Sequence, residues 1–307
     1  MREATPSPVE AVATIVQRLA VLLASGVAPA STWGYRAERG DAPEVVKRVA
    51  REVGAGRDPS AAIIESIDRR PSPDDGVWRG LAAAWAVATD AGAPLAQSLD
   101  AFAESLRALA QVQRDQNVAL AGPVATARMV MTLPLIAVLF GMALGFDTLG
   151  TLIGTLPGAV CLIVGIVLMA AARWWNARLV ASARPHDVTP GLTLELMAIA
   201  VTGGSSIDRA KAAVAAARGR AGLTPDQDAA VDDILELSQR AGVPAAALLT
   251  SEAAQQRRRA KAEGERRAAT LAVTLMLPLG ICILPAFMLL GVAPLLISVV
   301  MSTITTL

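Results

Sequence analysis

Few residues in this sequence have the type and spacing that catalysis or metal binding needs. His186 is the only histidine, and Cys161 and Cys282 each lie inside a long apolar stretch, which favours small core thiols over a disulfide or a metal site. The segment VTGGSS (201–206) suggests a phosphate-binding loop, but it lacks the GxxxxGK[ST] spacing and follows no predicted strand. A turn between helices is the better interpretation. We therefore expect no catalytic residue, no cofactor and no metal.

Two groups of charged residues stand out in the C-terminal third of the sequence. Three acids on one helical face, Asp232, Asp233 and Glu236, form either a solvated surface or a contact for a partner protein. A basic run follows them and directly precedes an apolar stretch, a position typical of a membrane-proximal anchor that binds anionic lipid headgroups. Its members are Arg257, Arg258, Arg259, Lys261, Arg266 and Arg267. The net charge of +1 and the aromatic content of 3% argue against nucleic acid as a partner.

Long apolar stretches explain the composition of the chain. It has 307 residues, of which 53% are hydrophobic and 18% charged, and the charges avoid three blocks. A membrane span needs about 20 apolar residues, and the blocks lie at 129–146, at 148–172 and from 268 to the C-terminus. The sequence therefore predicts an integral membrane protein with three transmembrane helices. It leaves open whether 268–307 forms one kinked helix or a helix broken at 291–294.

The distribution of arginine predicts the orientation of these spans. The link FDTLG (146–150) between the first two blocks contains no lysine or arginine. Arg173, Arg178 and Arg184 follow the second block, and the basic run precedes the third. Because cytoplasmic flanks carry the excess of positive charge, we expect both large polar regions to be cytoplasmic and the C-terminus to lie outside.

The polar regions have helical patterns. Asp58 is a suitable N-cap with Pro59 at the first helical position, and Thr224 with Gln227 forms a capping box before an amphipathic stretch. No segment alternates polar and apolar residues for long enough to predict a strand. We therefore expect two small all-α bundles.

An internal repeat relates the two polar regions. AGAPLAQSL (91–99) matches AGVPAAALL (241–249), and each copy leads into a long polar helix and then a span. The spans begin similarly, with ATARMVMTLPL (125–135) and ATLAVTLMLPL (269–279). The AGxP pattern predicts a left-handed glycine at the end of one helix and a proline at the start of the next. The residues concerned are Gly92, Pro94, Gly242 and Pro244.

This repeated order of glycine turn, AGxP, long helix and LPL-containing span resembles the type II secretion system F-domain family. Its members are inner-membrane platform proteins of type II secretion systems, type IV pili and tight-adherence pili. The C-terminal LPLGICILPAFMLLGVAPLL (277–296) looks most like the tight-adherence (Tad/Flp) pilus assembly branch. Many members of that branch carry a single F domain, whereas this chain has two copies of the pattern.

The resemblance implies an all-α integral membrane protein with two tandem cytoplasmic helical bundles and three transmembrane helices. The expected boundaries are a first F domain at 1–122, a transmembrane hairpin at 123–172, a second F domain at 173–267 and a C-terminal transmembrane helix and tail at 268–307.

The resemblance also implies a scaffold in the bacterial inner membrane and not an enzyme. Such a platform couples a cytoplasmic hexameric ATPase to the extraction and polymerisation of pilin or pseudopilin subunits. Further expected partners are membrane lipid and either a second F-domain platform protein or another copy of the chain. A charged helix that runs directly into a span, as the sequence predicts here, could transmit motion that a Gly/Ser linker would absorb.

The alternative functions are a secondary transporter and a membrane-anchored sensor with helical cytoplasmic domains. A transporter usually needs ionisable groups in the middle of the membrane. Arg128 and Asp147 are the ionisable residues nearest to that position, and both fall at the ends of predicted spans. A sensor needs a ligand site, and the sequence of the polar regions indicates none.

Overall fold

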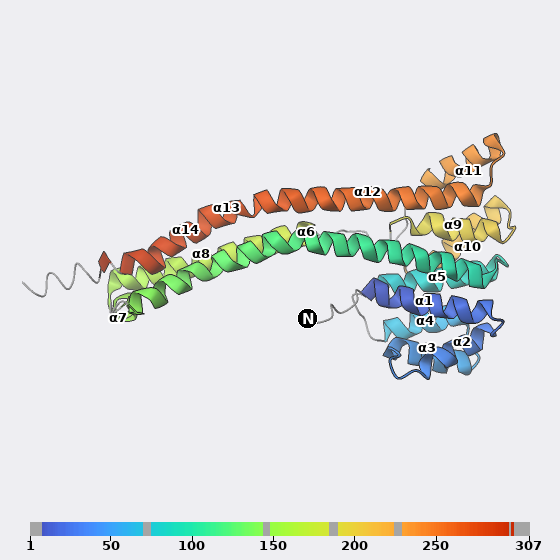
Figure 1. The fold of residues 1–307 in the computed structure, drawn as a ribbon, viewed down its shortest axis with the longest axis horizontal. Helices are drawn as coiled ribbons and strands as arrows, with labels where there is room; N and C mark the ends of the chain where they lie inside the picture. Colours follow the sequence, from blue (N-terminus) through green and yellow to red (C-terminus); the bar gives the residue numbers. More distant parts are fainter. Residues whose placement is uncertain are drawn as a thin grey trace, which may run out of the picture. The chain divides into compact units, whose positions relative to one another are not determined.

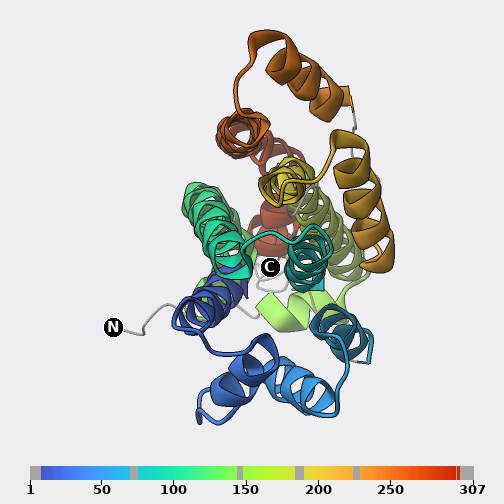
Figure 2. The same ribbon diagram turned by 90° about the vertical axis from the view of Figure 1, so that its right-hand side faces the viewer.

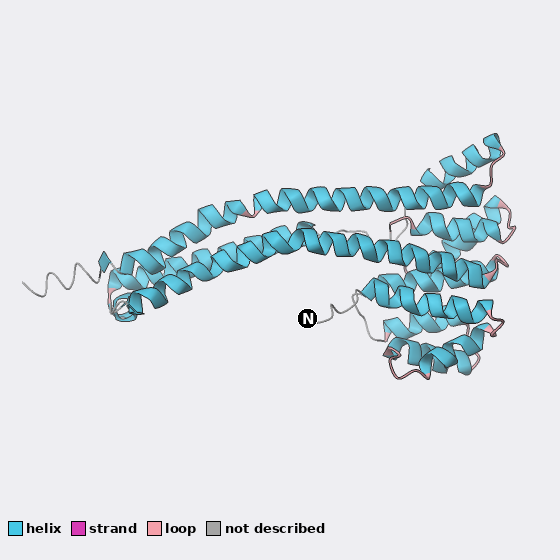
Figure 3. Ribbon diagram, in the orientation of Figure 1, coloured by secondary structure: helices cyan, strands magenta, loops and turns pink. Residues whose placement is uncertain are grey.

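The computed structural model describes residues 8–69, 75–143, 148–183, 190–223, 229–294 and 296–297. Within these ranges the regular elements are all helices (Figure 3), as the sequence predicts. The chain divides into two compact units, which we call the polar unit (Met1–Arg114 and Asp187–Lys261) and the apolar unit (Asp115–His186 and Ala262–Leu307).

The polar unit combines helices from both ends of the chain (Figure 1). Two long helices, α6 and α12, each contribute only their N-terminal part to this unit, because their later residues belong to the apolar unit. The helices are α1 (Pro8–Ala24), α2 (Pro29–Ala37), α3 (Glu44–Gly54), α4 (Pro59–Asp68), α5 (Asp75–Asp90), α6 (Leu95–Ala143), α9 (Leu192–Thr202), α10 (Ile207–Arg220), α11 (Ala229–Ala241) and α12 (Ala245–Thr274).

A local signal accounts for how α4 starts. The side chain of Asp58 accepts a hydrogen bond from the backbone N–H of Ala61 at 3.0 Å, and Pro59 occupies the first position of α4. This arrangement satisfies one of the N–H groups that a helix start leaves without a partner. The predicted N-cap of α4 is therefore confirmed.

Two helices, α5 and α9, form the centre of the polar unit. Every residue of α5 from Val77 to Ala88 is buried except Arg79, and all but one of the nine α9 residues from Leu192 to Ala200 are buried. The two helices contact each other, and α5 also contacts α1, α4 and α10; Figure 2 shows α5 and α9 nearly end-on. A helix that is apolar on all sides must be covered on all sides.

This requirement changes the predicted domain organisation. The two polar regions were expected to form separate bundles, but their buried residues belong to one hydrophobic core. The reason lies in α5 and α9, which come from different polar regions and cover each other. Neither helix has the polar face that an isolated amphipathic bundle would present to water.

Three stretches are long and apolar enough to cross a membrane, and they lie wholly or partly in the apolar unit, at Val124–Ala143, Leu156–Ser182 and Ala245–Val292. The last of these begins in the polar unit, and its apolar part lies towards its C-terminal end. The elements of the unit are the rest of α6 and α12, α7 (Thr148–Gly154), α8 (Leu156–Ala183), α13 (Met276–Pro278), η1 (Leu279–Ile283), α14 (Leu284–Phe287) and η2 (Met288–Val292), where η denotes a π-helical turn.

The second span starts later than the sequence suggests. The apolar block at 148–172 was expected to form one helix, but α7 ends at Gly154 and α8 begins at Leu156. The hydroxyl of Thr155 accepts a hydrogen bond from the backbone N–H of Gly158 at 3.1 Å, which is the geometry of an N-cap. Pro157 sits in the first turn of α8, where its missing N–H costs nothing. The capping threonine therefore sets the start of the span.

The third span is helical through the segment where a break was considered possible. Residues 276–294 are helical, with π turns at Leu279–Ile283 and Met288–Val292. Each π turn ends two residues before a proline, Pro285 or Pro294. A proline ring in a helix removes a hydrogen bond and clashes with the carbonyl one turn earlier, and a wider turn accommodates it. Residues 276–294 therefore form a continuous helical segment that is adapted to its prolines.

Some sequence expectations concern positions outside the described residues. They are the capping box Thr224–Gln227, Asp147 in the link between the first two spans, Arg184 and His186.

Candidate functional site

The first AGxP turn joins α5 to α6 in the polar unit. Gly92 has φ +67°, a conformation that glycine adopts without a Cβ clash. The backbone N–H of Gly92 donates to the Thr89 carbonyl at 3.3 Å, and that of Ala93 donates to the Ala88 carbonyl at 2.9 Å. These two bonds form a Schellman C-cap. Pro94 then directly precedes the first residue of α6.

The second AGxP turn, between α11 and α12, is closed differently. Gly242 has φ +66°, and its N–H donates to the Ser238 carbonyl at 2.9 Å, which is the simpler single-bond αL cap. The Ser238 hydroxyl donates to the Val243 carbonyl at 2.6 Å and ties the turn to the end of α11. Pro244 again precedes the next helix. The repeat thus preserves the glycine and the proline but not the hydrogen-bond pattern.

The first AGxP turn lies directly against the glycine turn that follows α9. A Cβ atom added to Gly203 would lie 2.3 Å from the carbonyl oxygen of Ala91. Only a residue without a side chain allows the two turns to approach this closely. VTGGSS (201–206) therefore forms a packing turn between α9 and α10, in agreement with the interpretation made from its sequence.

A buried ion pair joins α9 to α12. The guanidinium of Arg257 binds the carboxylate of Glu195, and these side chains are only 12% and 14% exposed. Both residues line a cavity of about 410 Å³ together with residues of α6, among them Ser98, Phe102 and Glu104. Arg257 was predicted to belong to a membrane-proximal anchor, but here its side chain lies inside the polar unit.

The burial of Glu195 affects its protonation. Removal from water raises the pKa of the Glu195 carboxyl from 4.5 to about 7, and the nearby Arg257 charge offsets only part of this rise. Sequence reasoning missed Glu195, although a signal was present. It is the lone acid in the apolar segment LTLELMAIAV (192–201), and an acid in such a helix requires a buried partner.

Three other members of the basic run have partners on the same helix. Arg258 donates to the Gln255 side chain at 2.7 Å, Arg259 lies 3.6 Å from Glu252, and Arg267 lies 3.3 Å from Glu263. Lys261 is half-buried and Arg266 is exposed. The run is therefore a row of mostly exposed side chains along α12, interrupted by the buried Arg257.

The acidic residues of α11 lie on its exposed face. Asp232, Asp233 and Glu236 are all exposed, while Val231 and Leu235 are buried. Glu236 also lies 3.4 Å from Arg240 within the same helix. A row of exposed acids fits a contact with a basic partner protein. It fits a surface that is solvated by water equally well.

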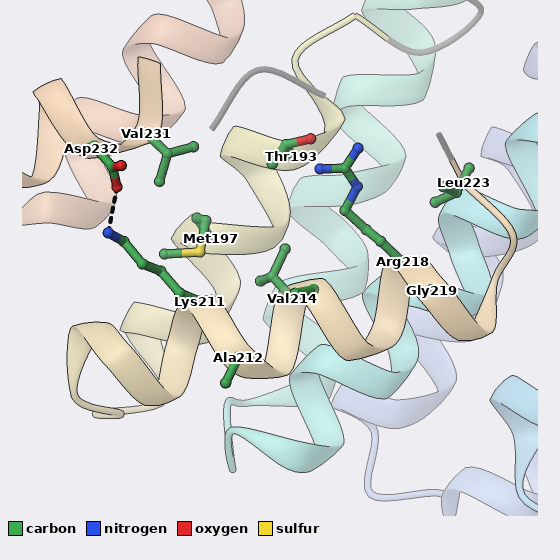
Figure 4. Close-up of a pocket in the computed structure, with 11 residues that line it drawn as sticks. Thr193, Met197, Lys211, Ala212, Val214, Arg218, Gly219, Leu223, Val231 and Asp232 are labelled. Atoms are coloured by element: carbon green, nitrogen blue, oxygen red, sulfur yellow. Dashed lines mark hydrogen bonds and ion pairs between the residues drawn. The ribbon is translucent and has the colours of Figure 1, made fainter. Parts of the chain in front are cut away.

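Next to this acidic row is a cavity of about 510 Å³ between α9, α10 and α11. Asp232 forms an ion pair with Lys211 at its edge, and Arg218 points from α10 towards Thr193 on α9 (Figure 4). Met197 and Val214 provide apolar walls.

The apolar unit contains a further polar group that the sequence analysis did not identify. Asn176, on α8, is 7% exposed, and neither its Oδ1 nor its Nδ2 atom has a hydrogen-bond partner among the described residues. Arg128 and Arg173 line the same cavity as Asn176. Both cysteines of the chain also lie in this unit as free thiols, and no cluster of potential metal ligands occurs within the described ranges.

Comparison with known proteins identifies one family. Residues 15–143 match the model of the family described as Type II secretion system (T2SS), protein F. No curated protein and no solved structure gives a significant match to the chain. The matched segment runs from within α1 to the last residue of α6, and so it contains most of the first polar region and the first apolar span. The match supports the type II secretion system F-domain family for this part of the chain, and with the three apolar helices it indicates a protein of the inner membrane.

Proposed function

We propose that this chain is an inner-membrane platform protein that supports assembly of a type IV-like pilus or a type II secretion pseudopilus. The observation that carries the proposal is the family match over residues 15–143, which includes most of the first polar region and the span that follows it. The C-terminal sequence 277–296 favours the tight-adherence branch of the family.

The proposed mechanism is mechanical and uses the long helices. α6 has 49 residues and α12 has 30, and each includes residues of both units. A continuous helix resists bending far better than a flexible linker does. In this proposal a cytoplasmic hexameric ATPase binds the polar unit, with the acidic row Asp232, Asp233 and Glu236 as part of the contact, and the helices carry its movement to pilin subunits in the membrane.

The proposal places the polar unit in the cytoplasm. Arg173 and Arg178 near the end of α8 and the basic residues of α12 supply the positive charge that favours a cytoplasmic location. A reporter that is active only outside the cytoplasm tests this orientation when it is fused at Asp147 or at Gly222. We expect activity from the fusion at Asp147 alone, and activity from the fusion at Gly222 would reverse the orientation.

Deletion of the chain from its native host tests the function. We expect surface filaments or pseudopilus-dependent secretion to be lost, while pilin is still made and inserted in the membrane. Normal assembly in the deletion strain would show that the protein is not a platform. Re-expression of the unchanged chain provides the control.

A second variant tests the mechanical role of α12. Insertion of Gly-Gly-Ser-Gly after Glu263 interrupts the helix at an exposed site, and Gly264→Ala serves as a matched control that improves helix propensity by about 1 kcal/mol. The inserted protein is expected to reach the membrane and to co-purify with its ATPase, but to fail in assembly. If the inserted protein supports assembly as well as the unchanged chain does, α12 anchors the polar unit but does not transmit movement.

A further inference from the structure

The cavity beside Asn176 has the features of a binding site for a phosphate group. It has a volume of about 410 Å³ and is lined by residues of α6, α8 and Leu275 at the end of α12, all of them in the apolar unit. Its polar members are Arg128, Arg173 and Asn176, and its apolar members include Met131 and Val180. No acidic side chain among the described residues lines it.

The amide atoms of Asn176 lack the partners that buried groups normally have. Asn176 is 7% exposed, and both of its amide atoms are without a hydrogen-bond partner among the described residues. Buried side-chain amides are almost always hydrogen-bonded. Asn176 lines the cavity, and rotation of its amide towards the cavity would let a ligand with acceptor oxygens satisfy the Nδ2 donor.

The two arginines favour a ligand with a negative charge. Arg128 comes from α6 and Arg173 from α8, and both side chains are exposed, so a molecule outside the chain can reach them. A guanidinium presents a planar set of N–H donors that matches the oxygens of a phosphate. Two such groups without an acid in the cavity wall favour an anion over a neutral or zwitterionic molecule.

The apolar wall indicates where the phosphate comes from. Met131, Val180 and Leu275 line the same cavity and offer no hydrogen bond to a free phosphate ion, but they suit the glycerol and acyl carbons of a lipid. Arg128 lies in the first turns of the span Val124–Ala143, and Arg173 directly follows the apolar block 148–172 of the second span. Both are therefore near the ends of spans, where lipid headgroups are found.

We propose that Arg128, Arg173 and Asn176 bind the phosphate of an anionic glycerophospholipid. The two guanidinium groups bind the phosphate oxygens, the Asn176 amide donates a further hydrogen bond, and the acyl chains extend along the apolar wall. The proposal concerns the described residues of the apolar unit and does not depend on the role of the protein in assembly.

The test measures thermal unfolding of the purified full-length chain in a neutral detergent. Phosphatidylglycerol is added in one arm, phosphatidylcholine in a second and inorganic phosphate in a third. We expect phosphatidylglycerol alone to raise the melting temperature. The double variant Arg128→Gln and Arg173→Gln should bind it about tenfold more weakly or worse, since each arginine loses a charge-assisted hydrogen bond.

Two further variants keep the test decisive if the double variant folds poorly. Asn176→Asp has nearly the same shape and places an acid beside the arginines, so it should weaken the response to phosphatidylglycerol while the protein itself remains folded. Arg178→Gln is the matched control, because Arg178 lies on the same helix but is stacked on Trp174, 5.5 Å from the ring centre, and does not line the cavity.

The possible results separate the sources of phosphate. An equal response to phosphatidylglycerol in all variants, or an equal response of the unchanged chain to phosphatidylcholine, would overturn the site. A response to inorganic phosphate alone that the cavity variants abolish would overturn the lipid assignment and indicate a soluble phosphate compound.

Discussion

The polar and apolar units use the same kinds of apolar side chain in opposite ways. In the polar unit Leu81 and Trp85 are 0% and 2% exposed, whereas in the apolar unit Leu135 and Phe140 are 61% and 63% exposed. Water favours the burial of apolar surface. Lipid tails are as apolar as leucine, so a membrane span gains little by hiding such side chains from them. Different forces therefore hold the two units together.

The packing contacts of the two units reflect this difference. The polar unit has one large hydrophobic core that includes a Trp33–Trp85 ring contact with centroids 5.7 Å apart. In the apolar unit, helices instead approach at small residues. A Cβ added to Gly165 would lie 2.4 Å from the Cγ atom of Leu290, and one added to Gly291 would lie 2.8 Å from the Cβ atom of Ala137. Small residues permit such close helix packing inside a membrane.

The largest effect is expected from loss of a core aromatic side chain. Trp85→Ala should lower the free energy of unfolding of the polar unit by about 3–5 kcal/mol, because it removes a buried ring and leaves a cavity. Phe140→Ala, at an exposed position of the apolar unit, is the control and should change stability little. Thermal unfolding followed by circular dichroism in detergent measures both. Similar losses in the two variants would contradict the distinction between the units.

The next largest effect concerns the contact between the two turns of the polar unit. Gly203→Ala should destabilise the protein towards the upper end of about 1–3 kcal/mol, because the new methyl group meets the backbone carbonyl of Ala91, which cannot rotate away. Gly34→Ala places a methyl group in open space within α2 and should stabilise by about 0.5–1 kcal/mol. The same thermal unfolding assay compares the stability of the two variants with that of the unchanged chain. A neutral Gly203→Ala variant would mean that the two turns can separate without cost.

A smaller effect is expected at the close contact of the apolar unit. Gly165→Ala should cost about 1 kcal/mol, near the lower end for overpacking, because the Leu290 side chain can change rotamer. The double variant with Leu290→Ala should recover part of this loss, and Gly154→Ala, which meets open space, is the control. Additive losses in the double variant would show that the two residues do not interact.

The same difference explains what the sequence could predict. In the polar unit, cap residues such as Asp58 and glycines such as Gly92 act through local backbone geometry, and the structure contains the conformations that they predict. The joining of α5 and α9 in one core was missed, because their contact links residues far apart in the sequence. Periodicity shows which face of a helix is buried but does not show which helix covers it.

In the apolar unit the sequence predicted the number of spans. It did not predict where the second span begins or which of its residues are buried. Hydropathy does not distinguish α7 from α8, because the break depends on one hydroxyl, that of Thr155. Nor does it indicate that Asn176 is buried, since no apolar stripe marks the inner face of a span. The candidate lipid site could therefore not be predicted from the sequence, because it depends on how the helices of this unit pack.

The effect that best separates the units is the pH dependence contributed by Glu195. Its pKa is about 7 in the folded protein against 4.5 as the ordinary value, so between these values the folded state holds more protons than the unfolded chain. Raising the pH through this window must therefore lower stability. A fall in melting temperature of a few degrees between pH 5.5 and pH 8 is expected, since Arg257 offsets part of the cost of the buried charge.

The variant Glu195→Gln isolates this contribution. It keeps the shape of the side chain and removes its titration, so its melting temperature should decline less over the same pH range than that of the unchanged chain. Glu263→Gln is the matched control, because Glu263 is an exposed acid paired with Arg267 in the apolar unit. If the unchanged chain and Glu195→Gln have the same pH profile, the carboxylate of Glu195 is already ionised throughout this range. The ion pair with Arg257 would then outweigh burial, and the polar unit would tolerate an internal charge as readily as its surface does.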